Sequence, residues 1–161
     1  NGRRSNDQNL TFSTIIFWYG KKTLDDIKNR VDSLGLKNVD VKETEEGITI
    51  SIENIQFLPD SAELVLSEQE KLNRIAEILK AYPERDLLIT GHTALAGTKA
   101  ARQALSIERA NAVAQYLVTK NVREAHRVFT QGFGAERPLV PNTTEENRAK
   151  NRRVEITIID K

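Results

Sequence analysis

Two kinds of hydrophobic periodicity alternate along the chain from residue 47, and this alternation restricts the fold more than any other feature. Isoleucine alternates with polar residues over 47–53, and valine or isoleucine does so over 153–159, as in strands with one buried face. Shorter apolar strands are predicted at 86–90 and 127–131, each preceded by a helical pattern. The order is therefore strand, helix, strand, helix, strand, a polar loop and a final strand. It predicts an α/β fold in which two helices cover one mixed sheet.

The two helices are recognised by their ends and by their apolar stripes. The first is predicted to begin at a capping box of Ser67 and Glu70 and to end before Pro83. The second is predicted to begin after Ser106, because a stripe at helical spacing follows it. The members of that stripe are Ala110, Val113, Ala114 and Leu117. This start places Arg109 in the first turn, where a cation faces the positive end of the helix dipole at a cost of a few tenths of a kcal/mol.

The N-terminal part of the chain is predicted to be a strand followed by a helix. Residues 10–20 read LTFSTIIFWYG and favour a strand, and the helix after them stops at Gly35. A hairpin is expected over 39–53. We therefore divide the chain into a flanking strand–helix segment, 1–37, and a main domain, 38–161.

The composition is that of a soluble globular domain. The chain has 161 residues, of which 39% are hydrophobic and 29% charged, with a net charge of +1 and no cysteine. No stretch approaches the roughly 20 apolar residues of a membrane span. We expect any export signal or membrane anchor to lie upstream of this chain.

Motifs for catalysis, metal binding and nucleic-acid binding are weak. The two histidines, His92 and His126, are far apart in sequence, and without cysteine a transition-metal site is disfavoured. No nucleophile elbow or zinc-protease motif occurs, and the segment GFGAER lacks a third glycine at phosphate-binding spacing. The basic run RAKNRRVE has no interleaved aromatic residues and enters a strand, which argues against a nucleic-acid surface. We expect neither an enzyme nor a cofactor.

Four blocks resemble, in order and spacing, the OmpA-like C-terminal domain. They read ITGHT, LSIERANAVAQYL, RVFTQGFGAERPLVPN and NRAKNRRVEITI. This family is the peptidoglycan-binding module of bacterial outer-membrane proteins, peptidoglycan-associated lipoproteins and flagellar stator proteins, and the resemblance covers roughly residues 38–160. It implies a two-layer α/β sandwich with the two main helices on one face and ligand-binding loops at one edge. It also implies a periplasmic location, with attachment to the outer membrane through a region outside this chain.

The resemblance implies a site for the diaminopimelate of the peptidoglycan stem peptide, which carries an ammonium and a carboxylate. Arg109 matches the family's arginine and would hold the carboxylate together with free amides at the predicted helix start, which would offset the cost of a cation there. Where the family has an Asp after Gly-His-Thr, this chain has Ala94, and Arg102 replaces the family's Asn. The residues that the resemblance places at or around the site are Asp60, His92, Thr93, Ala94, Arg102, Arg109, Asn151 and Arg153.

Two functions remain open at this point. The missing carboxylate removes a charge-assisted hydrogen bond of about 1.5–3 kcal/mol, or roughly ten- to a hundredfold in affinity. Either the domain binds a stem peptide of different chemistry, or it has kept the fold as a structural or interaction module for other envelope proteins without binding peptidoglycan. The simpler alternative for Arg109 is a surface ion pair with Glu108, Glu145 or Glu146, and for His92 it is a turn residue bonded to backbone.

Overall fold

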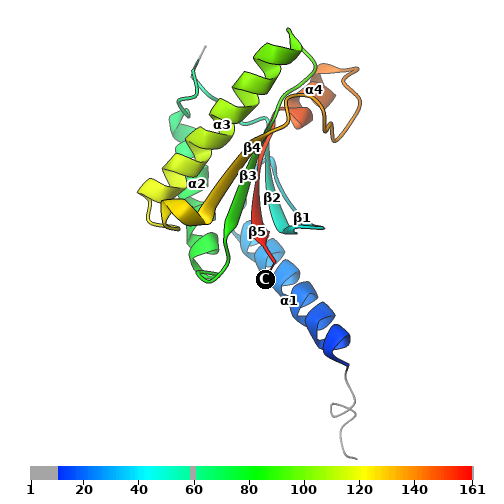
Figure 1. Cartoon of the computed structure of the whole chain (residues 1–161), viewed down its shortest axis with the longest axis vertical. Coiled ribbons are helices and arrows are strands. Elements are labelled where there is room, and N and C mark those ends of the chain that lie inside the picture. Colours follow the sequence, from blue (N-terminus) through cyan, green and yellow to red (C-terminus); the bar gives the residue numbers. More distant parts are fainter. Residues whose placement is uncertain (1–10, 59–60, 161) are drawn as a thin grey trace, which may run out of the picture.

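The computed structural model of the protein describes residues 11–58 and 61–160. Within them, five strands form one sheet in the order β1-β2-β5-β3-β4 (Figure 1). The strands are β1 (Val39–Thr44), β2 (Gly47–Glu53), β3 (Leu87–His92), β4 (Val128–Gly132) and β5 (Arg153–Ile159). Among these strands β3 and β4 pair in parallel and the other neighbours pair antiparallel. The mixed sheet predicted from the sequence is confirmed.

Branched aliphatic side chains on one face of the sheet line up across the strands. Ile50 pairs with Ile156, which pairs on its other side with Ile89, and all three are fully buried. The neighbouring rows repeat this pairing with Ile48, Ile158 and Leu87 on one side and with Ile52 and Val154 on the other. Each such side chain stabilises the fold by about 1.5–3 kcal/mol when buried. A shift of register by one residue would turn all of them to the opposite face, so the register is strongly determined.

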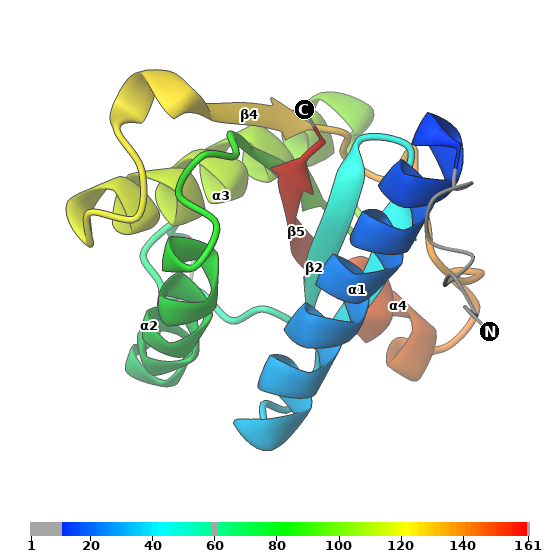
Figure 2. The ribbon, with the colours of Figure 1, turned by 90° about the horizontal axis from the view of Figure 1, so that it is seen from below.

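Three long helices pack against this apolar face (Figure 2). Their bounds are α1 (Phe12–Ser33), α2 (Leu66–Lys80) and α3 (Lys99–Thr119). Ile75 of α2 and Val113 of α3 belong to the same core cluster as the isoleucines of the sheet. The two main helices on one face are thus confirmed. Ile27 and Val31 of α1 join the same cluster, so α1 also covers this face.

The strand predicted at residues 10–20 is wrong. Residues 12–20 are the first part of α1, while residue 10 lies outside the described residues. The Thr11 hydroxyl caps the helix by accepting a hydrogen bond from the Thr14 amide at 3.2 Å. A short apolar run fits a strand or a helix equally well, and here the backbone continues into the helix that carries Ile27. No helix in the described ranges has the length and apolarity needed to cross a membrane.

The predicted starts of the other two helices are also wrong. α3 begins at Lys99, and the Thr98 hydroxyl accepts a hydrogen bond from the Ala101 amide. Arg109 therefore lies in the third turn, and the dipole cost inferred from a start after Ser106 does not apply to it. α2 begins at Leu66 after Val65, which has no side chain able to cap it. A polar residue inside a helix, such as Ser67 in the first turn of α2 or Ser106 two turns into α3, imitates a cap when only local spacing is considered.

A short helix lies in the segment that was predicted to be a polar loop. This helix, α4 (Glu145–Asn151), begins after Thr144, whose hydroxyl accepts a hydrogen bond from the Asn147 amide at 3.1 Å. Its first turn carries Glu145 and Glu146 and its last turn Arg148 and Lys150, the charge order that the helix dipole favours. The cap and the charges were visible in the sequence. The segment lacks the apolar stripe on which the helix predictions relied.

We predict that Ile27→Ala lowers the free energy of unfolding by about 2–5 kcal/mol, because it opens a cavity at a fully buried position. The division of the chain at residue 37 stays a prediction. A loss of this size would show that the first segment, 1–37, contributes to the stability of the whole chain. Chemical denaturation followed by circular dichroism measures the change.

The matched control for Ile27 is Ile15→Ala in the same helix, where 38% of the side chain is exposed. It should change the free energy of unfolding by less than about 1 kcal/mol. Equal effects of the two substitutions would contradict the assignment of α1 to the core.

Candidate functional site

Buried polar atoms without a hydrogen-bond partner gather at the end of β3 and in the first half of α3. Of six such side-chain atoms in the described residues, three belong to Thr93, Arg102 and Arg109, and a fourth belongs to His92, whose ring lies on the other face of the sheet. Folded proteins leave few buried polar groups unsatisfied, and each one calls for an explanation such as a bound ligand, water or ion. This region is therefore the candidate site.

Arg109 lies in the middle of α3 and is half-buried. Its guanidinium carbon lies 4.7 Å from the centre of the Phe57 ring, a cation–π contact that fixes the side chain. Burial and the nearby Arg152 lower the pKa of Arg109 below its usual range. Both causes disfavour the charged guanidinium. A hydrogen-bond acceptor at the buried Nε would therefore offset part of the free energy that burial of this cation costs.

Two of the three carboxylates suggested as surface partners of Arg109 are engaged elsewhere. Glu145 pairs with Arg152 at 2.5 Å and with Arg148 at 3.2 Å, and Glu146 pairs with Lys150. Arg148 and Arg152 lower the pKa of Glu145, with the hydrogen bond from Arg152 as the largest cause. Among the described residues, no carboxylate lies within ion-pair distance of Arg109. The surface ion-pair alternative is not realised there.

A close contact between β3 and α3 brings the turn after β3 toward Arg109. A Cβ added to Gly91 would lie 2.0 Å from the carbonyl oxygen of Ser106, so only glycine allows the strand to approach the helix so closely. Ser106 lies one helical turn before Arg109. Thr93 and Ala94 lie two and three residues after Gly91 and are both buried.

Hydrogen bonds hold the turn after β3 in place. The Thr93 amide donates to the Gly134 carbonyl at 2.8 Å, and the Leu95 amide donates to Asn142 Oδ1 at 3.3 Å. Arg102 Nη1 donates to the Gly97 carbonyl at 2.6 Å, while its Nε has no partner. Arg102 therefore closes the loop before α3 and adds a second cation to this end of the molecule.

Asn151 is fully buried and acts through its neighbours. Its Oδ1 accepts hydrogen bonds from the amides of Leu139 and Val140, and its Nδ2 donates to Asn142 Oδ1 at 2.9 Å. Since Asn142 also holds Leu95, Asn151 positions the turn that contains Ala94. This position favours a structural role for Asn151, which would support the turn and make no direct contact with a ligand.

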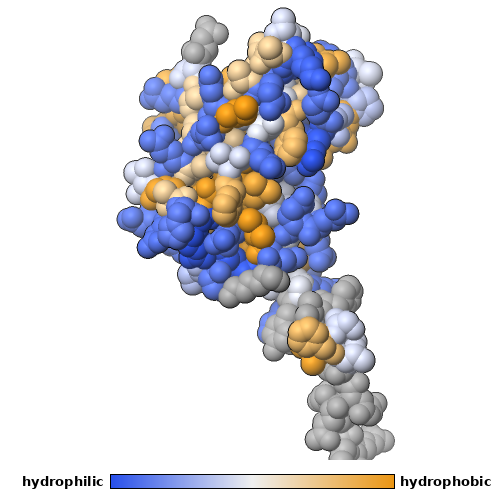
Figure 3. All heavy atoms as spheres, in the orientation of Figure 1, coloured by the Kyte–Doolittle hydropathy of each residue, from blue (hydrophilic) through white to orange (hydrophobic). Residues whose placement is uncertain are grey.

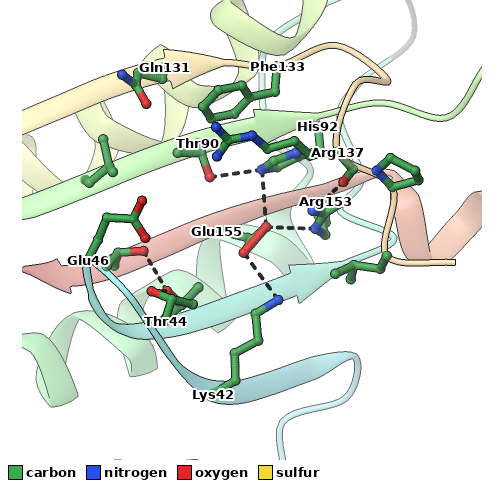
Figure 4. A pocket seen from close by; sticks show the side chains of 15 residues that line it. Lys42, Thr44, Glu46, Thr90, His92, Gln131, Phe133, Arg137, Arg153 and Glu155 are labelled. Carbon is green, nitrogen blue, oxygen red and sulfur yellow. Dashed lines mark hydrogen bonds and ion pairs between the residues drawn. The ribbon is translucent and has the colours of Figure 1, made fainter.

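His92 and Arg153 lie on the opposite, polar face of the sheet, away from Arg109. They line a hollow of about 280 Å³ beside the loop after β4 (Figure 4). Glu155 is central there, because its carboxylate contacts Arg153 at 2.9 Å, His92 at 3.2 Å and Lys42 at 3.6 Å. The structure thus separates two of the predicted site residues from Arg109.

The His92 ring is held neutral at the centre of this polar face. Glu155 alone would favour the imidazolium, but Arg153 and Lys42 already share its carboxylate. Burial, with Arg153, Arg137 and Lys42 as further causes, lowers the pKa of His92 to about 3. His92 also stacks on Phe133, with ring centres 5.6 Å apart. These contacts assign His92 to the support of the loop rather than to a simple backbone turn.

Two contributors were missed by the sequence analysis. Phe57, which contacts Arg109, has nothing in its local pattern that marks it. Glu155 had a signal, since it is an acid on a strand between Val154 and Ile156. Asp60, predicted at the site, lies outside the described residues. No group of three or more metal-ligating side chains occurs in the described part of the chain.

Comparison with known proteins adds independent information. The model of the OmpA family matches residues 56–152, more than half of the chain. The chain is 43% identical over 104 residues to the peptidoglycan-binding protein ArfA of Mycobacterium tuberculosis, covering 65% of this chain and 32% of that protein. It is 37% identical over 105 residues to outer membrane porin F of Pseudomonas aeruginosa, covering 65% and 30%. The chain thus spans about a third of the length of these relatives.

A solved structure supports the fold assignment. The structure of the cell wall anchor of the T6SS from Pseudomonas aeruginosa resembles this fold with a TM-score of 0.71 and 28% sequence identity. The resemblance covers 84% of this chain and 97% of that one. The two-layer arrangement described above therefore recurs in a protein whose sequence has diverged widely.

We predict that His92 makes the fold sensitive to acid. The unfolded chain binds a proton at His92 near pH 6.5, whereas the folded chain binds it only near pH 3. The free energy of unfolding should therefore fall as the pH decreases from about 6.5 toward 3, by about 2–3 kcal/mol between pH 7 and pH 4. His92→Gln should remove most of this component, which denaturation at the two pH values measures.

His126→Gln provides the matched control, because the side chain of His126 is 73% exposed. It should leave the difference between pH 7 and pH 4 as large as in the parent protein. An unchanged difference in His92→Gln would contradict the neutral, buried state of His92.

Proposed function

Because the chain belongs to the OmpA family, we propose that it is a non-catalytic domain that binds peptidoglycan by holding the stem peptide. In this proposal the contact is a carboxylate of the stem peptide on Arg109. The observation that carries it is the half-buried guanidinium of Arg109, whose Nε is buried without an acceptor. A carboxylate supplies the acceptor and the compensating charge together.

The geometry around Arg109 supports an anion as the ligand. Phe57 holds one face of the guanidinium, and Arg102 adds a second cation on the same helix. Arg109 and Arg102 are seven residues apart, which places them on the same side of α3 two turns apart. Planar, bidentate recognition of a carboxylate is the role to which the arginine fork is best suited.

The names of the relatives support the same ligand and location. ArfA is named a peptidoglycan-binding protein and porin F an outer membrane protein, and the solved T6SS structure is named a cell wall anchor. We extend these properties to this chain as proposals. The domain would act in the periplasm, attached to the outer membrane through a region outside this chain.

The position of Ala94 supports an altered recognition of diaminopimelate. Ala94 lies two residues after the end of β3, in the turn that follows the contact of Gly91 with Ser106, and in this proposal it faces the ligand that Arg109 holds. Its methyl group can neither accept a hydrogen bond nor balance a cation. In this proposal the site holds the carboxylate of the ligand and makes no ion pair to an ammonium at this position.

We predict that Arg109→Ala weakens binding to insoluble peptidoglycan by about 1.5–3 kcal/mol, or roughly ten- to a hundredfold. The loss follows from removing the cation and its donors from the carboxylate. Co-sedimentation with purified peptidoglycan at several protein concentrations measures it, and thermal unfolding verifies that the variant is folded.

The matched control for Arg109 is Arg30→Ala on α1, which removes the same charge from a helix. Arg30 pairs with Asp26 on an exposed surface and should leave binding unchanged. If both variants bind as the parent does, Arg109 is not the binding residue. If the parent itself does not co-sediment, the structural or interaction-module alternative takes its place.

We predict that Ala94→Asp tightens binding to diaminopimelate fragments with a free ammonium and carboxylate by roughly ten- to a hundredfold. The new carboxylate would pair with the ammonium while Arg109 holds the other charge. Arg102 could compete for it, so Ala94→Asp with Arg102→Asn is the cleaner variant. Isothermal titration with soluble fragments measures the change. A gain in neither variant would show that the turn differs in more than this one residue.

A further inference from the structure

The charges around Arg109 are unbalanced. Arg109 and Arg152 are close enough for Arg152 to disfavour the Arg109 cation, and Arg102 adds a third positive charge at this end. The carboxylate that contacts this group in the described residues is Glu145, and it is divided between Arg148 and Arg152. The surface at the α4 end of the molecule is largely hydrophilic (Figure 3). Arg109 and Arg102 make no ion pair among the described residues, so a ligand carboxylate that reaches them meets unpaired cations.

Unpaired positive charge acts in opposite ways on the two charges of a diamino acid. It attracts the carboxylate at the end of the side chain and repels the ammonium attached to the same carbon. Ala94, buried in the turn after β3, offers no charge to offset that repulsion. Acylation of the amine removes its positive charge and leaves the carboxylate intact. The electrostatics therefore favour an acylated amine over a free one.

Exposed apolar side chains border the site and suit an acyl group. Leu95, which follows Ala94, is 59% exposed, and Leu58, which follows Phe57, is 42% exposed. Leu95 is held in place because its amide donates to Asn142. Exposed leucines next to a cationic site provide apolar contacts without a further charge. They are an observation independent of the arginines.

We propose that the site selects stem peptides in which the side-chain amine of the diamino acid is acylated and its carboxylate is free. This is the chemical state of that amine when two stem peptides are cross-linked through it. The inference rests on the proposed function, because it assumes that Arg109 holds the carboxylate. It goes further by naming which form of the peptide the site prefers.

Three synthetic tripeptides of the stem test this preference by isothermal titration against the whole chain. They carry diaminopimelate with a free side-chain amine, with that amine acetylated, or with the amine acetylated and the adjacent carboxylate converted to an amide. The acetylated peptide should bind about two- to fivefold more tightly than the free amine, the size expected for an exposed charge contact. The amide should bind at least tenfold more weakly than the acetylated peptide.

Ala94→Asp should reverse the order of the first two peptides, because it introduces a carboxylate that pairs with the ammonium. Ala104→Asp adds the same charge at an exposed position of α3 and should keep the order of the parent. This pair of variants separates a local contact at the turn from a change in net charge.

The outcomes distinguish this inference from the proposed function. Equal or tighter binding of the free amine by the parent overturns the preference for an acylated amine, while carboxylate-dependent binding would leave the proposed function in place. Failure of all three peptides and of insoluble peptidoglycan to bind overturns both. Equal binding of the acetylated peptide and its amide overturns the inference alone, because it shows that the side-chain carboxylate is not the group that Arg109 holds.

Discussion

The row of Ile50, Ile156 and Ile89 across the three central strands is the packing interaction on which the rest of the structure depends. These side chains are fully buried and directly paired, so they determine which face of the sheet the helices cover. Once that face is apolar, the alternate residues of the same strands must form a polar face. The same row sets the register of β3, and so determines where β3 ends and where the turn with Ala94 begins.

The site is built on the contact between β3 and α3 rather than on a flexible loop. Gly91 allows the strand to touch the helix at Ser106, one helical turn before Arg109. Arg109 is then half-buried against Phe57 with no carboxylate partner in the described part of the chain. Such an arrangement costs free energy in the unliganded state. It is favourable where the missing acceptor arrives with a ligand.

Side chains on the polar face of the sheet hold the loop after β4. Glu155 joins Arg153, Lys42 and His92, and Arg153 also donates to the Arg137 carbonyl at 2.9 Å. This network fixes the loop after β4, which in turn holds Thr93 through the Gly134 carbonyl. His92 and Arg153 are thus connected to the site through the backbone, although neither lies beside Arg109. The two faces are coupled at the end of β3.

The sequence by itself determined the order of the strands and of the two main helices, and their mixed sheet, because the hydrophobic period of each of these segments is a local property. It did not predict α4, which has no apolar stripe. It also identified Arg109 and the turn at Ala94 through the resemblance of its motifs. Tertiary structure alone decided that residues 12–20 are helical, that α3 begins eight residues before Ile107, and that His92 faces away from Arg109. It also placed Phe57 and Arg152 beside Arg109. These contacts join residues more than forty positions apart, and no local spacing can specify them, because they arise only when the helices pack on the sheet.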